Sequence, residues 1–333
     1  MNDESELMET VKNIIEKRGK EALEKARKEI LGLPYKGGIV QEALRHFARV
    51  TLRGALPVFP ALISLSCEVV GGKTEKTVST GAAMTLLAGA ADVHDDIIDQ
   101  SVTKNSKVTV FGKFGKDITI LTGDILLLQG LMLLHEECES LPKEQRETIL
   151  YMVRRASYEI SHAEALETRL RKKRDLQPQE YLEIIKMKAV VPDVHARIGA
   201  ILGNGDTEKI EALGHYGRTF GILSTIREEF IDLLEYPEFQ NRLSNECLPL
   251  PIIYALQNPE IETMISPILE SKKVDKRSLI EMAKTVFDSE EVQELKKEMD
   301  FMVREENKRL NSIKGLRILA ELQIMIKALI EDL

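Results

Sequence analysis

The sequence predicts an all-α protein, on two observations. Apolar residues recur at the three- and four-residue spacing of helices along most of the chain, among many Glu, Lys and Leu residues. Gly and Pro separate these stretches, and no β-branched runs alternate with polar residues as they do in strands. We therefore expect a single domain of about ten or more helices, with an N-terminal helix in 1–36 and a helical core in 37–333.

The expected helices follow from the breaks between them. Gly32 and Pro34 end the first helix, and Gly71-Gly72 ends the third. Asn204-Gly-Asp-Thr207 resembles a helix N-cap. In chain order, the expected helices are 6–33, 40–52, 61–70, an acidic helix through 82–99, one from 117 that contains Gly123-Asp124, 144–173, 180–202 despite Pro192, 208–236 and 277–333.

Composition bounds the class of protein. The chain has 333 residues, of which 43% are hydrophobic, enough for a substantial core. A net charge of −8 argues against nucleic-acid binding. No run of about 18 apolar residues occurs, so we expect no transmembrane segment, and MNDESELMET lacks the apolar core of a signal peptide. The three cysteines have no metal-ligand spacing. These features predict a cytoplasmic protein.

The acidic helix holds the clearest chemical signal. Between Thr77 and Thr103 there is no Lys or Arg to offset four carboxylates, which belong to Asp92, Asp95, Asp96 and Asp99. On a helix these residues fall towards one face, where like charges three and four apart destabilise it by about 0.2–0.5 kcal/mol per pair. A hard divalent cation satisfies such a face, and Mg²⁺ takes carboxylate oxygens alongside substrate phosphates. The alternative is a solvated acidic face.

His94-Asp-Asp-Ile-Ile-Asp99 resembles the first aspartate-rich motif, DDxxD, of the trans-isoprenyl diphosphate synthase (polyprenyl synthetase) family. The resemblance extends from Val40 to Leu256 in the same order and spacing. It includes Gly123-Asp124, a tyrosine-to-lysine stretch over 181–188, a second acidic region in 217–232, and Pro251-Ile-Ile-Tyr-Ala-Leu256, which is similar to the family's Pro-Leu-Ile-x-Ala-Leu.

The resemblance implies the isoprenoid synthase fold, a helical bundle around a deep central cavity, and a homodimer. It implies that Mg²⁺ and an allylic prenyl diphosphate meet at the cavity mouth, where the carbon–oxygen bond ionises to an allylic cation and pyrophosphate. The implied metal ligands are Asp95, Asp96, Asp99, Glu228, Glu229 and Asp232. Lys104, Lys188 and Arg227 are the candidates for binding the diphosphate, and Asp95, Asp96, Asp99 and Lys188 are the candidate catalytic residues. Phe59, Ala90 and Ala91 are expected to line the cavity, where small residues leave room for longer prenyl tails.

The second acidic region departs from the family pattern FQxxDDxxD. The pattern aligns with 224–232, where Glu228 and Glu229 replace aspartates and Asp232 is retained. Glutamate is one methylene longer, so a metal would sit differently, and Arg227 would partly neutralise the site. A surface helix of salt bridges is the alternative interpretation. Asp92 stands where the family has an apolar residue, and it would extend the metal site by one turn.

A larger departure concerns isopentenyl diphosphate, which the family holds with basic residues of GGKRxRP, a histidine and an Arg-Arg pair. The positions of these groups are occupied here by Leu56, Pro57 and Phe59, by Ala88, and by Lys104-Asn105. Each charge-assisted hydrogen bond contributes about 1.5–3 kcal/mol, so losing three weakens binding by about 10³-fold or more. The groups implied for the allylic diphosphate survive, whereas those for isopentenyl diphosphate do not.

Two histidines offer weaker signals. His162, with Glu164 and Glu167 on one helix, could mark a metal site, although exposed or satisfied groups are the simpler interpretation. His195, two turns after Lys188, could face the cavity.

Three hypotheses therefore remain. The first is a Mg²⁺-dependent prenyltransferase that ionises an allylic prenyl diphosphate and uses an acceptor other than isopentenyl diphosphate. The second is a non-catalytic or regulatory subunit of a hetero-oligomeric prenyl diphosphate synthase. The third is an ordinary chain-elongating polyprenyl diphosphate synthase.

Overall fold

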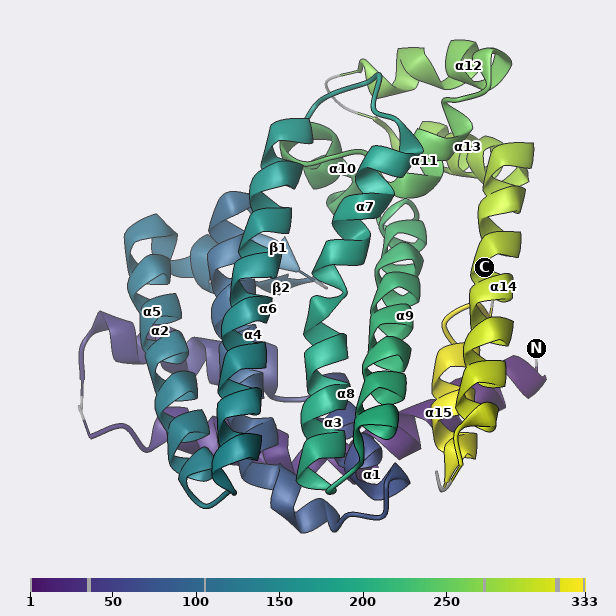
Figure 1. Cartoon of the computed structure of the whole chain (residues 1–333). Helices are drawn as coiled ribbons and strands as arrows, with labels where there is room; N and C mark the ends of the chain where they lie inside the picture. Colours follow the sequence, from purple (N-terminus) through teal and green to yellow (C-terminus); the bar gives the residue numbers. More distant parts are fainter. Residues whose placement is uncertain (1, 35–36, 105, 272–273, 315–317, 332) are drawn as a thin grey trace.

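The computed structural model describes residues 2–34, 37–104, 106–271, 274–314, 318–331 and 333, and they form a bundle of helices (Figure 1). The expected all-α class is confirmed. The α-helices are α1 (Asn2–Leu31), α2 (Ile39–Phe47), α3 (Val58–Val69), α4 (Val78–Ile98), α5 (Val110–Glu139), α6 (Lys143–Leu170), α7 (Pro178–Lys188), α8 (Val190–Leu202), α9 (Thr207–Asp232), α10 (Tyr236–Asn245), α11 (Leu250–Ala255), α12 (Pro259–Leu269), α13 (Lys276–Asp288), α14 (Glu290–Ser312) and α15 (Leu319–Lys327). A π-helical turn, η1 (Ala48–Leu52), follows α2, and a 3₁₀ turn, η2 (Thr74–Thr77), precedes α4.

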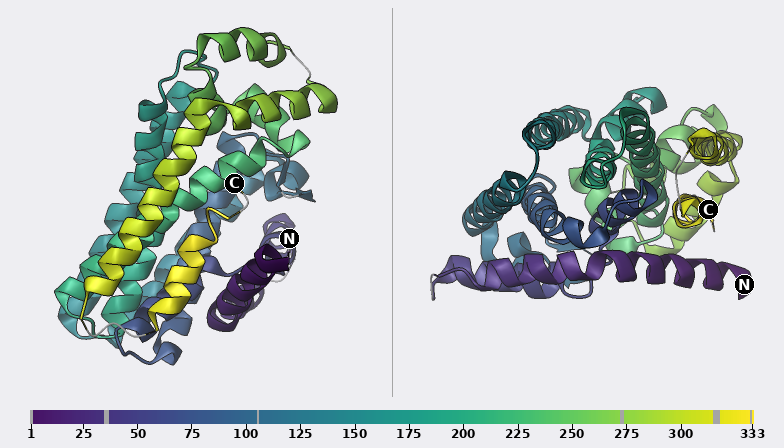
Figure 2. Two further views of the ribbon diagram at one scale, coloured as in Figure 1. Left: turned by 90° about the vertical axis from the view of Figure 1, so that its right-hand side faces the viewer. Right: turned by 60° about the horizontal axis from the view of Figure 1, so that its bottom comes forward.

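Helices α4 to α9 run side by side along the length of the bundle, and α1 crosses their lower ends in Figure 1. Helix α1 packs against α3 and α4, α4 packs against α5, and α8 packs against both α3 and α9. Figure 2 shows α1 lying along one side of the bundle. Helices α10 to α13 gather at the upper end, above α7 and α9 (Figure 1). The candidate site residues lie beneath this cap.

The acidic segment ends a helix that is buried over most of its length. Small residues of α4 let its neighbours approach closely: a Cβ at Gly89 would lie 2.5 Å from Cζ of Phe47 on α2. Ala82, Ala83 and Leu86 are fully buried, so the helix is anchored in the core. Burial of this apolar part holds the acidic C-terminal turns of α4 in place, because the helix backbone is continuous.

A small hairpin follows α4, in a segment that lies between two of the predicted helices. Strands β1 (Thr103–Lys104) and β2 (Lys107–Val108) pair antiparallel, with Thr103 opposite Val108 and Lys104 opposite Lys107. Two-residue strands leave no alternating pattern to detect in a sequence. The hairpin turns the chain back, so that Lys104 lies over the acidic turns of α4. Asn105, the other residue aligned with the family's Arg-Arg pair, lies outside the described residues.

The helix predicted over 180–202 is divided in two, and the break is at Ala189 rather than at Pro192. Pro192 is the third residue of α8, and a proline in the first turn of a helix gives up no backbone hydrogen bond. Lys188 is therefore the last residue of α7. Gly221 of α9 packs against the ring of Pro192, which brings α8 and α9 close together.

Helix α5 presents an apolar surface. Its exposed apolar side chains are Ile120, Leu121, Ile125, Leu127, Leu128, Leu131 and Met132. Within the described residues it is the one helix long and apolar enough to cross a membrane by length and composition. One such helix is weak support for a membrane span, since core helices of soluble proteins satisfy the same criteria, and 39% of its most apolar window is buried in the bundle.

Candidate active site

A single ammonium group serves three carboxylates of the acidic segment. Lys104 Nζ lies 3.0 Å from Asp92 Oδ1, 3.0 Å from Asp96 Oδ1 and 3.7 Å from Asp95 Oδ2. Asp92, which has no counterpart in the family motif, thus acts with the two aspartates that follow it. The three carboxylates share a face of α4 because they are three and four residues apart.

This segment holds more negative charge than its neighbours balance. Burial, followed by repulsion from Asp92 and Asp95, raises the pKa of Asp96 to about 7 despite the attraction of Lys104. Burial, then Asp95 and Glu246, raises the pKa of Asp99 to about 8. Oδ1 of Asp95 is buried and accepts no hydrogen bond from the residues that the structure describes. The acidic segment therefore has unsatisfied hard oxygen atoms of the kind that bind Mg²⁺.

Arg171 joins the C-terminal ends of α6 and α4. It follows the last residue of α6, forms an ion pair with Asp99 and donates a hydrogen bond from Nη1 to the carbonyl oxygen of Ile98 at 2.7 Å. This residue was not among the predicted site residues. It directly precedes Lys172-Lys173-Arg174, a basic run that is typical of a solvated turn, so the available signal indicated surface charge.

Lys188 is held by two glutamates of α6. Its Nζ lies 2.9 Å from Glu164 Oε1 and forms a second ion pair with Glu167. Burial acts to lower the pKa of Lys188, but Glu167 and Glu164 together raise it above its ordinary value, so the amine stays charged. The metal site considered for His162, Glu164 and Glu167 is not assembled. Both glutamates pair with Lys188, and the His162 ring stacks on Tyr158, with the ring centroids 6.3 Å apart.

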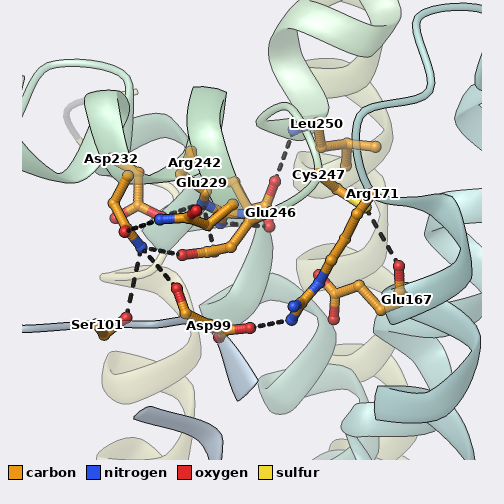
Figure 3. A network of polar contacts seen from close by, with 12 residues as sticks. Asp99, Ser101, Glu167, Arg171, Glu229, Asp232, Arg242, Glu246, Cys247 and Leu250 are labelled. Atoms are coloured by element: carbon orange, nitrogen blue, oxygen red, sulfur yellow. Dashed lines mark hydrogen bonds and ion pairs between the residues drawn. The ribbon is translucent and has the colours of Figure 1, made fainter. Parts of the chain in front are cut away.

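The second acidic region is paired with an arginine (Figure 3). Glu229 is buried, and its Oε1 accepts hydrogen bonds from Arg242 Nη2 at 2.7 Å and from the Tyr181 hydroxyl at 2.8 Å. Its Oε2 accepts one from the backbone N–H of Leu250 at 2.6 Å. Asp232 Oδ2 accepts from Nε and Nη2 of the same arginine at 3.0 and 2.8 Å. Both acidic residues are thus held by a buried guanidinium from α10.

The other two candidates on α9 do not reach the mouth. Arg227 donates to the carbonyl oxygens of Leu329 at 3.3 Å and Glu331 at 2.6 Å, so the expectation that it binds the diphosphate is not supported. Glu228 is exposed and lines neither cavity described below. Helix geometry accounts for Arg227, which lies two residues from both Thr225 and Glu229 and so points away from the face that these two share.

Two cavities meet at this mouth, sharing Asp95, Lys188 and Thr225 in their linings. The smaller, of about 180 Å³, is lined by three basic side chains, those of Lys104, Lys188 and Arg242, and by seven acidic ones, those of Asp95, Asp99, Glu167, Glu229, Asp232, Glu238 and Glu246. The larger, of about 630 Å³, has walls formed mainly by Phe59, Ala88, Ala91, Ile98, Ile160, Val191 and Phe220. A charged chamber thus opens into an apolar one.

The expected cavity-lining residues divide into two groups. Phe59 and Ala91 line the larger cavity, but Ala90 is buried in the core and does not. His195 does not line it either. Its ring packs on Phe59, with centroids 5.0 Å apart, and complete burial lowers the pKa of His195 to about 4, so the imidazole is neutral.

Few basic groups surround the larger cavity. Among the described residues that line it, the sole Lys or Arg is Lys188. Leu56 is exposed outside the cavity, and Pro57 packs against Gly19 of α1. The apolar replacements read from the sequence therefore leave no described cation there for a second diphosphate, apart from the lysine already at the mouth.

The two acidic regions differ in their fit to Mg²⁺. Within the described residues, no three Asp, Glu, His or Cys side chains converge in an arrangement that could hold a metal ion. On α4, unsatisfied carboxylate oxygens fit the ion chemically, and Lys104 is the cation that Asp92, Asp95 and Asp96 share. On α9, the oxygens of Glu229 are already occupied by Arg242, Tyr181 and Leu250. The metal-ligand assignments stay predictions, and the geometry favours α4.

Comparison with known sequences gives one family. The family model described as "Polyprenyl synthetase" matches residues 41–286. The geranylgeranyl diphosphate synthase of Sulfolobus acidocaldarius is 25% identical over 222 residues, which cover 66% of this chain and 65% of that protein. The short chain isoprenyl diphosphate synthase of Methanothermobacter thermautotrophicus is 26% identical over 275 residues, covering 82% of this chain and 80% of that protein.

Solved structures share the fold over nearly the whole chain. The geranylgeranyl pyrophosphate synthetase of Pyrococcus horikoshii superposes with a TM-score of 0.84 at 23% identity, covering 97% of this chain and 99% of that chain. A polyprenyl synthase of Caulobacter crescentus, described as complexed with calcium and isoprenyl diphosphate, gives a TM-score of 0.78 at 17% identity, with 96% of each chain covered. At these identities the likeness establishes the fold.

Proposed function

This chain belongs to the polyprenyl synthetase family, whose members are prenyltransferases of isoprenoid biosynthesis, and from that premise we propose that it binds an allylic prenyl diphosphate with Mg²⁺ and ionises it. The observation that supports this most directly is the junction of the two cavities. A chamber rich in charge opens into an apolar chamber of about 630 Å³. This arrangement suits a molecule with a charged head and a long apolar tail.

The charge of the smaller cavity makes the proposed reaction depend on metal. Seven acidic side chains face three basic ones, so an anionic diphosphate would be repelled unless cations entered with it. Asp95, Asp96 and Asp99 would hold Mg²⁺, which when bound supplies the positive charge that stabilises the leaving pyrophosphate. The unsatisfied oxygen of Asp95 is the atom best placed to gain from this.

The chain's own cations would then bind and orient the diphosphate. Lys104 and Lys188 both line the smaller cavity, and Lys188 also lines the larger one. Each is now engaged by carboxylates, and its charge becomes available to phosphate oxygens once those carboxylates bind a metal. The apolar walls around Phe59, Ala88 and Phe220 would keep water from the allylic cation.

We propose that the acceptor carries no second diphosphate. A diphosphate acceptor would need cations in the larger cavity, where Lys188 is the single described Lys or Arg. An uncharged acceptor suits the apolar wall better. Ordinary chain elongation remains the alternative that fits the names of the relatives, and a partner-subunit role is favoured by the arginine that occupies the second acidic region.

We also propose a homodimer formed through the apolar surface of α5, in a cytoplasmic protein. Leu121, Leu128 and Met132 are each at least 50% exposed on this helix, and exposed apolar surface of this extent marks an interaction site. A hetero-oligomer with another prenyl diphosphate synthase would use the same surface. Mass measurement of the purified chain by light scattering, alone and with a second synthase, separates the two.

The activity is tested by incubating the protein with Mg²⁺ and geranyl, farnesyl or geranylgeranyl diphosphate, with and without isopentenyl diphosphate, and measuring pyrophosphate release. Release without isopentenyl diphosphate, and its loss in Asp95→Ala, would support the proposal. Elongated products would establish ordinary synthesis. Activity that appears only with a second synthase would favour the subunit.

A further inference from the structure

The second acidic region contains a cation that belongs to the chain itself. Arg242 is buried, and its guanidinium lies 2.7 Å from Glu229 Oε1 and 2.8 Å from Asp232 Oδ2. Its Nε also lies 3.6 Å from Glu246 Oε2, and Nη1 donates to the Tyr181 hydroxyl at 3.2 Å. Figure 3 shows the guanidinium set between these carboxylates. It occupies the position from which a metal ion would have to bind both acidic residues.

Both oxygen atoms of Glu229 already accept hydrogen bonds. Oε1 accepts from Arg242 and Tyr181, and Oε2 accepts from the backbone N–H of Leu250, the first residue of α11. A metal bound to Oε1 would therefore have to displace a hydrogen bond from Arg242 or Tyr181, and one bound to Oε2 would crowd the amide that fixes α11. Arg242 is only 7% exposed, so its guanidinium cannot move aside into solvent without a change in the packing around it.

The first acidic segment differs in its cations. Asp99 at its end pairs with Arg171, but Asp92, Asp95 and Asp96 share Lys104, whose side chain is 33% exposed and whose ammonium is a single point charge on a flexible stem. Asp95 keeps a buried oxygen that accepts no hydrogen bond from described residues. A metal can bind here while the lysine moves aside, whereas a planar guanidinium that bridges two carboxylates is fixed by its geometry.

We propose that the guanidinium of Arg242 takes the place of a metal ion at the second acidic region, so that divalent cations are held from the Asp92–Asp99 side alone. This inference rests on the proposed function in one respect, that metal and diphosphate meet at this mouth. Glu229, Asp232 and Arg242 then form a fixed wall of the smaller cavity. Arg242 acts as a positioning residue, because it orients Glu229 and Tyr181 and holds α10 against α9.

The test measures metal binding and does not depend on turnover. Mn²⁺ replaces Mg²⁺ as the probe, inorganic pyrophosphate is added in excess, and the Mn²⁺ bound to the full chain is counted by electron paramagnetic resonance. Asp95→Asn and Glu229→Gln form a matched pair, since each replaces one carboxylate with its amide. Asp95→Asn should weaken Mn²⁺ binding by about ten-fold or more. Glu229→Gln should leave the number and affinity of bound Mn²⁺ unchanged and lower only the melting temperature.

A third variant tests whether Arg242 itself prevents a metal ion from binding to Glu229 and Asp232. Arg242→Met leaves Glu229 and Asp232 without their cation, and the folded variant should bind more Mn²⁺ per chain than the unaltered protein. A folded Arg242→Met that gains none would overturn the inference. If this variant does not fold, Glu229→Gln decides alone: weakening as large as that of Asp95→Asn overturns the inference while leaving the proposed function standing. An unaltered chain that binds no Mn²⁺ with pyrophosphate would overturn both.

Discussion

Replacing Arg242 by methionine should cost a large part of the stability of this fold. Removing one partner of a buried ion pair costs about 3–5 kcal/mol, because the other charge stays buried and unpaired. Glu229 would keep the Tyr181 hydroxyl and the Leu250 amide, and the Asp232 side chain is 19% exposed and gains water. We therefore expect a loss near the lower limit, about 3 kcal/mol, out of the 5–15 kcal/mol that is usual for a folded domain.

The assay is urea unfolding followed by circular dichroism over a range of pH. Burial already raises the pKa of Glu229, and Arg242 acts to lower it, so the variant raises it further. The native state then holds a proton that the unfolded state releases, and stability falls as pH rises through the folded pKa. The deficit should be greatest well above the ordinary glutamate pKa of about 4.3 and shrink as pH falls towards it.

Two outcomes would refute this reasoning. A loss below about 1 kcal/mol would be the size of one ordinary hydrogen bond, and it would mean that Arg242 is not the main counter-charge of Glu229. A loss independent of pH would point to packing instead. Arg277→Met is the matched control, because this arginine is exposed on α13 and, among the described residues, its side chain pairs with Glu281 one turn along the same helix. It should leave the unfolding curve unchanged.

Three further variants test the cavity, the mouth and the surface. Ala91→Phe fills the larger cavity and should weaken the binding of geranylgeranyl diphosphate, measured by calorimetry, more than that of geranyl diphosphate. Equal effects on the two ligands would contradict the cavity assignment. Ala90→Phe instead overpacks the core and should lower the free energy of unfolding by about 1–3 kcal/mol. Lys188→Met removes the ammonium group that would bind the diphosphate and should slow pyrophosphate release by about 10²-fold or more. An unchanged rate would exclude Lys188 from the reaction. Leu128→Glu should halve the mass seen by light scattering if α5 forms the dimer, with Ile280→Glu, which is also exposed but lies on α13, as the control that keeps it.

Local patterns in the sequence predicted α4 and its acidic face well. Asp92, Asp95 and Asp96 lie three and four residues apart, and that spacing alone places them together on a helix. The apolar stretch that contains Ala82 and Leu86 likewise indicated a helix in the interior, and both residues are buried. The resemblance to the family then assigned Lys188, which the structure places at the junction of the two cavities. In each case the information lies within one helix or one motif.

Pairing across the chain was beyond such patterns. Arg171 meets an aspartate 72 positions away, and nothing near Arg171 in the sequence distinguishes it from the three basic residues that follow. Arg242 lies in α10, a region whose prolines indicated irregular structure. The break at Ala189 was not predicted, because 180–202 was expected to be one helix and nothing in the local sequence marks Ala189 as a helix end. Side-chain partners and helix breaks are decided by tertiary packing.

The unequal partners of the two acidic regions bear on the choice between enzyme and subunit. A chain that had lost catalysis would be free to neutralise both regions permanently, and an arginine between carboxylates does so at α9. At α4 the neutralisation is incomplete: one lysine faces Asp92, Asp95 and Asp96, and an oxygen of Asp95 stays without a hydrogen bond from described residues. An unsatisfied buried carboxylate costs stability, so its retention is best explained by a ligand that binds there. A ligand of a carboxylate oxygen is a cation. A bound cation favours an active diphosphate site over a purely structural subunit.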